Sequence, residues 1–308
     1  MPDRKYVCLN GGLGNQMFQL AFGLFVSQSD ILYLDGNFGV QRKNSKGQID
    51  LLDFNLPQNV RILLNENINF GTRISNYLLR NGIESNKKLD YKRQSISKIF
   101  EIFLSIRYKK KIKLYVAKNV GFDSFESDDY NYFIGYFQSN NWITKGAVYE
   151  QMMKLELLET SSTYDDLKSR IKENENLIMH IRLGDYENES KIGILDSIYF
   201  DRAIKIIEGK KSFDYLWLFS DEPEKAIKFI SQEYLHKTIV VNQKLTTPET
   251  FDLMRYGNSY IISNSSFSWW ASFLKYDKNA TIVAPKPWFL TDSPKGIYSP
   301  DWIKVDRC

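Results

Sequence analysis

A short apolar run in the middle of this 308-residue chain ends in residues that could do chemistry. Residues 177–181 have the composition of a buried strand, and Arg182 follows at once. Side chains alternate along a strand, so His180 and Arg182 share a face. Ligands of open α/β sheets bind beyond the carboxyl ends of strands, and a guanidinium is a planar donor suited to a diphosphate. The alternatives are a solvated charge for Arg182 and a hydrogen-bonded core position for His180.

Carboxylates follow this arginine closely. Asp185 is placed to orient Arg182 or to accept a proton as a base, and Glu187 and Glu189 are competing bases. A base is identified by its distance to the group that it deprotonates, so the sequence leaves these three open.

A glycine-rich turn follows the first strand-like run, at residues 6–10. Gly12 and Gly14 let the backbone approach a ligand closely, and the helix expected at residues 17–25 presents an N-terminus that favours anions. Asn15 in this turn is a candidate contact for a sugar or a phosphate. A tight turn between a strand and a helix needs glycine even without a ligand.

A polar segment rich in hydroxyl groups follows another apolar run, at residues 260–262, and opens a helix. Its side chains are helix caps or phosphate ligands, and a cap requires only one of them. The candidates are Asn264, Ser265, Ser266, Phe267 and Ser268. After a further strand, Ser220 and Asp221 are suited either to a nucleotide or to capping the next helix.

These motifs require strands that alternate with helices, which is typical of parallel α/β sheets. The expected strands are residues 6–10, 31–34, 132–137, 177–181, 215–219, 239–241, 260–262 and 281–284. The expected helices of the second half are residues 198–208, 223–233, 248–256 and 267–276. Residues 41–113 are less regular.

Composition excludes several classes of protein. Forty-one basic and 37 acidic residues give a net charge of +4, too small to indicate nucleic-acid binding. Cys8 lies in an expected buried strand and Cys308 is the last residue, which disfavours a disulfide framework. Two histidines and the absence of an Asp-x-Asp pair predict no metal site. No run approaches the roughly 18 apolar residues of a membrane span, so we expect a cytoplasmic protein.

One basic segment, Arg107 to Lys113, follows the apolar stripe Ile96, Phe100 and Phe103. Together they predict a basic amphipathic helix, and one reading of the basic run is a peripheral contact with anionic lipid at the inner membrane. The alternative is a solvated helix end.

In their order and spacing, five segments of this chain resemble the bacterial α-1,2-fucosyltransferases of glycosyltransferase family 11. They are GGLGNQMFQ from Gly11, GYFQS at 135–139, HIRLGDY at 180–186, FSDE at 219–222 and SNSSFSWW at 263–270. The resemblance implies a GT-B fold, with two Rossmann-like domains that face each other across a cleft. Residues 1–160 would form the acceptor-side domain, with irregular insertions, and residues 161–308 the domain that binds GDP-fucose.

The implied reaction is metal-independent transfer of L-fucose from GDP-β-L-fucose, with inversion, to the 2-hydroxyl of a β-galactoside. The acceptor would be an oligosaccharide or a glycolipid, as in O-antigen synthesis, and no cofactor is expected besides the donor. Arg182, Asp185 and His180 would be the catalytic residues, and the candidates in the three other polar segments would bind the donor. This chain departs from the family at Leu183, where a second arginine is usual.

Two other readings compete. Gly12 and Gly14 followed by Asp35 imitate the fingerprint of nicotinamide-dependent oxidoreductases, although Met17 replaces the third glycine. A non-catalytic protein that binds a glycan or a nucleotide is the other alternative.

Overall fold

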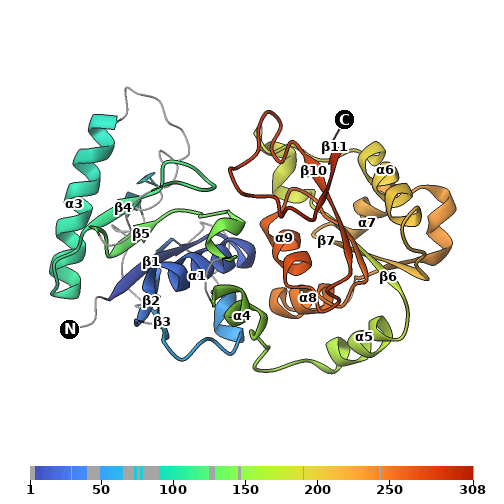
Figure 1. The fold of residues 1–308 in the computed structure, drawn as a ribbon, viewed down its shortest axis with the longest axis horizontal. Helices are drawn as coiled ribbons and strands as arrows, with labels where there is room; N and C mark the ends of the chain where they lie inside the picture. The colour runs from blue at the N-terminus through green and yellow to red at the C-terminus, as the bar shows by residue number, and fades with distance from the viewer. Residues whose placement is uncertain are drawn as a thin grey trace. The chain divides into compact units, whose positions relative to one another are not determined.

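The computed structural model describes residues 4–28, 30–39, 49–64, 73–74, 77–78, 90–124, 129–144, 147–189, 191–242 and 244–307. The chain divides into two compact units (Figure 1). Unit 1 is Met1–Leu155 with Pro294–Ile297, and unit 2 is Glu156–Ser293 with Tyr298–Cys308. Among the residues described, no helix combines the length and the apolar character needed to cross a bilayer.

Unit 1 is built on a parallel sheet with the strand order β3-β2-β1-β5-β4. The strands are β1 (Lys5–Asn10), β2 (Leu32–Gly39), β3 (Val60–Leu63), β4 (Leu114–Val116) and β5 (Tyr132–Ile134). The helices are α1 (Leu13–Ser27), α3 (Asp90–Tyr108) and α4 (Val148–Met153), with 3-10 turns η1 (Asp50–Asp53) and η4 (Asn140–Trp142). All of β1 is buried, as expected for a central parallel strand covered on both faces.

Unit 2 contains a six-stranded parallel sheet with the order β11-β10-β9-β6-β7-β8. The strands are β6 (Asn176–Ile181), β7 (Tyr215–Ser220), β8 (Thr238–Val240), β9 (Ser259–Ile261), β10 (Thr281–Lys286) and β11 (Ile303–Asp306). The helices are α5 (Ser162–Lys172), α6 (Ser197–Glu208), α7 (Pro223–Ala226), α8 (Thr247–Met254) and α9 (Ser266–Phe273). The 3-10 turns are η5 (Gly184–Asn188), η6 (Ile227–Phe229) and η7 (Gln232–Lys237).

Helices cover the sheets through apolar stripes. In unit 2, α6 buries Tyr199, Ala203 and Ile207 in the same core cluster as β6 and β7, at the spacing of one helix face. In unit 1, α3 buries Phe100 and Leu104 in a cluster with residues of β1, β2, β4 and β5. Two parallel sheets with flanking helices confirm the predicted α/β class, and two Rossmann-like units in one chain are the components of the GT-B fold.

Several predicted boundaries were wrong for identifiable reasons. The helix expected at 223–233 stops at Ala226, because Ile230 becomes extended and buries its side chain, and the Ser231 hydroxyl bonds the Asp201 carboxylate. The strand expected at 132–137 ends at Ile134, because Phe137 adopts a positive φ of 54° and stacks on Phe22. The edge strands β3, β4 and β11 were not predicted.

Candidate functional site

The polar residues of unit 2 gather where its strand order reverses. The chain runs from β6 to β7 on one side, whereas β9 lies on the other side of β6, so the β6/β9 boundary is a topological switch point. His180, near the end of β6, is linked across this boundary to Ser263, just after β9, by a 2.8 Å contact between Nδ1 and Oγ. The structure thus joins two of the segments singled out in the sequence.

Arg182 follows β6 and is held by a carboxylate from the neighbouring strand. Its Nε lies 3.4 Å from Oδ2 of Asp221, and the arginine side chain remains 34% exposed. The other oxygen of Asp221 accepts a 3.0 Å hydrogen bond from the backbone N–H of Leu183. A Cβ on Gly184 would meet Oδ2 of Asp221 at 2.4 Å, so this position needs glycine. Asp221 therefore fixes the arginine and the turn that follows it.

Tyr186 is a member of this site that the sequence analysis did not select, although it ends the HIRLGDY segment. Its ring centroid lies 5.7 Å from Cζ of Arg182, which is within the range of a cation–π contact. Its hydroxyl donates a weak 3.4 Å hydrogen bond to the backbone carbonyl of Asn264. Ser263, the partner of His180, was also missed as a site residue.

His180 is electrically neutral at neutral pH. Burial lowers its pKa to about 3, and the positive charge of Arg182 adds to the shift. A neutral imidazole can hold a hydrogen bond, but it has no labile proton to give as an acid near pH 7. We therefore regard His180 as a positioning residue.

The hydroxyl segment before α9 divides into two groups. Ser265 is the N-cap, because its Oγ accepts from the backbone N–H of Phe267. Ser268 is fully buried and donates to the carbonyls of Ser263 and Ser265, and Asn264 donates to the carbonyls of Ile192 and Gly193. Ser266 and Phe267 remain half-buried. Much of this segment thus shapes the turn.

Four predicted polar residues lie at the end of β7 or in the segment after β6. The Oγ of Ser220 accepts from the backbone N–H of Glu222, the N-cap residue of α7, so it holds the turn just before the helix. Glu187 is exposed, with Oε1 3.7 Å from Nζ of Lys225, and Glu189 is exposed as well. The backbone of Asp185 lies in η5, but its side chain is outside the described part of the structure.

The glycine turn of unit 1 lies at a second switch point, between β1 and β5. Gly11 has a φ of +78°, which favours glycine, and Gly12 is exposed with open space where a Cβ would lie. The Oδ1 of Asn15 accepts a 2.8 Å bond from Nε2 of Gln138 after β5. Gln19 in α1 is fully buried and joins both strand ends, since it accepts from the N–H of Asn10 and donates to the carbonyl of Gly135.

A carboxylate of the chain already occupies the start of α1. Asp50 in η1 is buried, and burial together with the charge of Asp53 raises its pKa to about 6. The backbone N–H of Leu13 opposes this shift, which places the carboxyl at the first turn of α1. The N-terminus of α1, which the sequence suggested as a site for an anionic ligand, therefore already faces the carboxyl group of Asp50. No sequence signal pointed to Asp50.

Asp35 is not available to a ligand. It is fully buried, and its oxygens accept hydrogen bonds from the hydroxyls of Tyr108 and Tyr132 and from the amide of Asn37. In a dinucleotide fingerprint the equivalent acid must reach a ribose. This geometry argues against the oxidoreductase reading.

Leu183 is also buried, in the core cluster of unit 2, so no second cation stands beside Arg182 at that position.

Within the described residues, no three His, Cys, Asp or Glu side chains are grouped as a metal site. Cys8 is buried, and burial raises the pKa of its thiol, so it is not a reactive nucleophile.

Comparisons with known proteins agree over almost the whole chain. A family model described as Glycosyl transferase family 11 matches residues 5–306. The O-antigen biosynthesis glycosyltransferase WbnK of Escherichia coli is 26% identical over 322 residues, covering 97% of this chain and 100% of the relative. The alpha-1,2-colitosyltransferase of Escherichia coli is 28% identical over 314 residues, with coverages of 97% and 98%.

Solved structures give weaker matches. The fucosyltransferase NodZ from Bradyrhizobium has a TM-score of 0.48 at 12% identity, covering 89% of this chain and 96% of that one. The ADP-heptose lipopolysaccharide heptosyltransferase II of Escherichia coli has a TM-score of 0.49 at 10% identity, with coverages of 98% and 90%.

Proposed function

This chain belongs to glycosyl transferase family 11, and we propose that it transfers L-fucose from GDP-β-L-fucose to the 2-hydroxyl of a β-galactoside glycan, with inversion. The product would be an O-antigen or another surface glycan, and the acceptor an oligosaccharide or a glycolipid. One observation carries the proposal: a half-exposed arginine, fixed by Asp221, stands at the switch point of a parallel sheet.

Fucose transfer leaves negative charge on the departing diphosphate, and Arg182 is the group proposed to neutralise it. Preorganised donors are effective because they need no reorganisation during the reaction, and the contact with Asp221 holds this guanidinium in place. Ser265 and Ser266 at the start of α9 would add hydroxyl donors, while Asn264, Phe267 and Ser268 hold the turn through hydrogen bonds of their own. Ser220 would act in the same indirect way.

The acceptor hydroxyl must lose a proton, and the carboxylates around η5 are the candidate bases. Asp221 already has the task of orienting Arg182, so that task does not require Asp185. We favour Asp185 as the base, with Glu187 and Glu189 as alternatives. A base should lose the low-pH limb of kcat when it becomes an amide, with little change in GDP affinity.

We assign unit 1 the acceptor side and a contact with the fucose ring. Gly12 is exposed, and a Cβ added there would meet no other atom. In the same turn, a hydrogen bond from Gln138 fixes the amide of Asn15. Gly14 lies buried in the first turn of α1 and would act through the backbone. Because Asp50 already occupies this helix end, a neutral sugar fits here better than a phosphate.

The direct test is incubation of the purified chain with GDP-[¹⁴C]fucose and lactose in excess EDTA. We expect a labelled trisaccharide whose fucose is linked α-1,2 to galactose. A loss of activity that Mn²⁺ restores would contradict the metal-independent mechanism. The absence of transfer to lactose and to a panel of other β-galactosides would contradict the proposed acceptor class.

A second candidate donor follows from one relative, whose name gives colitose as the transferred sugar. A family 11 site could therefore carry a different GDP-sugar. Rates with GDP-fucose and with the GDP derivative of colitose, measured side by side, would separate the two. The proposal predicts a higher kcat/KM with GDP-fucose.

A further inference from the structure

Helix α3 has two apolar faces, of which the protein core uses one. The stripe Ile96, Phe100 and Phe103, expected to be the apolar side of a basic amphipathic helix, packs in the core of unit 1. A second apolar stripe faces outward: Ile99, Ile102 and Ile106 are 56%, 62% and 74% exposed. Their spacing of three and four residues places them on one side of the helix, which we call the α3 outer face.

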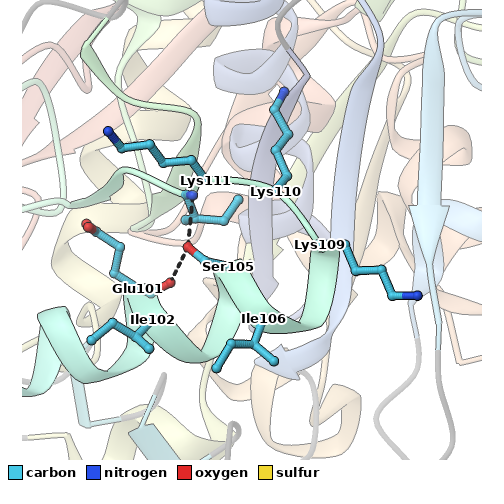
Figure 2. Close-up of a pocket in the computed structure, with 8 residues that line it drawn as sticks. Glu101, Ile102, Ser105, Ile106, Lys109, Lys110 and Lys111 are labelled. Atoms are coloured by element: carbon cyan, nitrogen blue, oxygen red, sulfur yellow. Dashed lines mark hydrogen bonds between the residues drawn. The ribbon is translucent and has the colours of Figure 1, made fainter.

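A basic turn ends this helix. Lys109 adopts a φ of +48°, which stops α3 and directs the chain back toward β4. The Ser105 hydroxyl fixes the turn, because it donates to the carbonyl of Glu101 at 2.8 Å and accepts from the N–H of Ile112 at 2.9 Å. Figure 2 shows Ile102 and Ile106 on the same side of the helix, with the lysines extending from the turn at its end. They line an open hollow of about 490 Å³.

The charge around the α3 outer face is strongly positive. Residues 94–118 contain seven basic residues and one acidic residue, Glu101. The Glu101 carboxylate accepts a 3.0 Å hydrogen bond from the backbone N–H of Leu114, so it is engaged by β4. The lysines that are exposed in this range are Lys98, Lys109, Lys111, Lys113 and Lys118.

Local structure does not account for this combination. Cations at a helix C-terminus are stabilised by the helix dipole, which explains the lysine turn. The helix dipole does not explain three exposed isoleucines on one side of the helix. The opposite side of α3 already supplies the packing against the core. An aliphatic face flanked by lysines is typical of helices that lie in the interface of an anionic bilayer.

We propose that the α3 outer face and the lysine turn dock unit 1 on an anionic phospholipid surface. The three isoleucines would enter the boundary between headgroups and acyl chains, while the lysines contact the phosphates. Charge complementarity selects this partner, because a protein interface is usually depleted of lysine. The proposal goes beyond the proposed activity and does not depend on it.

Co-sedimentation of the full chain with sucrose-loaded vesicles tests the proposal. We compare vesicles of 30% phosphatidylglycerol in phosphatidylcholine with vesicles of phosphatidylcholine alone, at low and at high salt. We expect binding to the anionic vesicles that weakens at high salt. Equal binding to both compositions, or binding to neither, would overturn the proposal.

Two triple variants separate apolar insertion from charge. Lys109→Gln with Lys111→Gln and Lys113→Gln should weaken binding about a hundredfold, since each lysine near the surface contributes roughly a factor of five. Ile99→Ser with Ile102→Ser and Ile106→Ser should weaken it at least about tenfold. Because these side chains are exposed, both variants should melt at the wild-type temperature.

Matched variants elsewhere provide the controls. Lys205→Gln with Lys210→Gln and Lys278→Gln removes three exposed charges, and Leu158→Ser with Ile198→Ser and Leu290→Ser removes three exposed apolar side chains of unit 2. Both controls should bind vesicles like the wild type. If they lose as much binding as the α3 variants, no specific face exists and the proposal fails. If the chain sediments as a dimer that the isoleucine variant dissociates, the face is a protein interface and the proposal also fails.

Discussion

The two units place their motifs at equivalent topological positions and use them differently. In unit 2 the switch point between β6 and β9 carries a half-exposed cation, Arg182, beside a neutral histidine. In unit 1 the switch point between β1 and β5 is joined by buried amide contacts of Gln19, and Asp50 occupies the start of its helix. The same fold position therefore carries a half-exposed cation in one unit and buried structural contacts in the other, and we propose that only the first binds an anion.

The largest expected effect concerns the cation. Arg182→Lys keeps the positive charge but loses the planar fork, so kcat/KM with GDP-fucose should fall at least about a hundredfold. Arg61→Lys in unit 1 is the control, because this exposed arginine donates to the nearby backbone carbonyls of Gln58 and Val60. Initial rates measure both. Near-normal turnover of the Arg182 variant would mean that catalysis does not need this guanidinium, and the proposed functional difference between the two units would fail.

The next effect concerns the stability of unit 1. Asp35→Asn replaces the buried carboxyl that accepts hydrogen bonds from the Tyr108 and Tyr132 hydroxyls, so the free energy of unfolding should fall by about 1–3 kcal/mol. The kcat/KM of the folded variant should stay close to wild type. Urea unfolding and initial rates test the two parts. A stable variant with impaired catalysis would mean that Asp35 contacts a substrate after all.

A pair of glycine variants sharpens the comparison further. Gly184→Ala would force a methyl group against the Asp221 carboxylate that holds Arg182, so kcat/KM should fall at least about tenfold. Gly12→Ala meets open space, so its melting temperature should not change. If Gly12→Ala nevertheless lowers kcat/KM, a substrate approaches that backbone, as proposed for unit 1. Unchanged activity would remove Gly12 from the donor site.

The last prediction is a pair of opposite pH dependences, which largely cancel in the wild type. The folded pKa of His180 is lowered to about 3 from 6.5, so its contribution to stability is complete above pH 6.5 and is lost as the pH falls toward 3. The folded pKa of Asp50 is raised to about 6 from 3.8, so its contribution is complete below pH 3.8 and is lost as the pH rises through 6.

These two contributions oppose each other over nearly the same pH range. Asp50→Asn should therefore make stability fall more steeply between pH 6 and pH 4, and His180→Asn should flatten that fall. Urea midpoints across this range measure both slopes. Identical slopes in the two variants and the wild type would show that neither group titrates as the structure indicates.

Sequence patterns were sufficient for the central strands and for one edge strand, β8, but not for the other edge strands of the two sheets. Buried parallel strands such as β1 and β6 read as continuous apolar runs. The missed strands β3, β4 and β11 are edge strands of three or four residues, with partly exposed side chains that resemble loops. Their pairing depends on neighbours distant in the sequence.

The site shows the same division. Arg182 and Asp221 lie in segments that the sequence singled out, because each directly follows an apolar strand. The contacts that distinguish the two units could not be predicted: Asp50 meets α1 across more than 30 residues, and Gln138 reaches Asn15 across 123. Such contacts follow from tertiary packing, which no local pattern encodes.

Calorimetric titration with GDP alone tests the central claim most directly. If the diphosphate binds at the edge of unit 2 and not at the glycine turn of unit 1, Arg182→Lys should weaken GDP binding at least about tenfold. Asn15→Ala should change the Kd of GDP by no more than about twofold, which corresponds to about 0.4 kcal/mol. Equal weakening in both variants, or a larger loss in Asn15→Ala, would contradict the account.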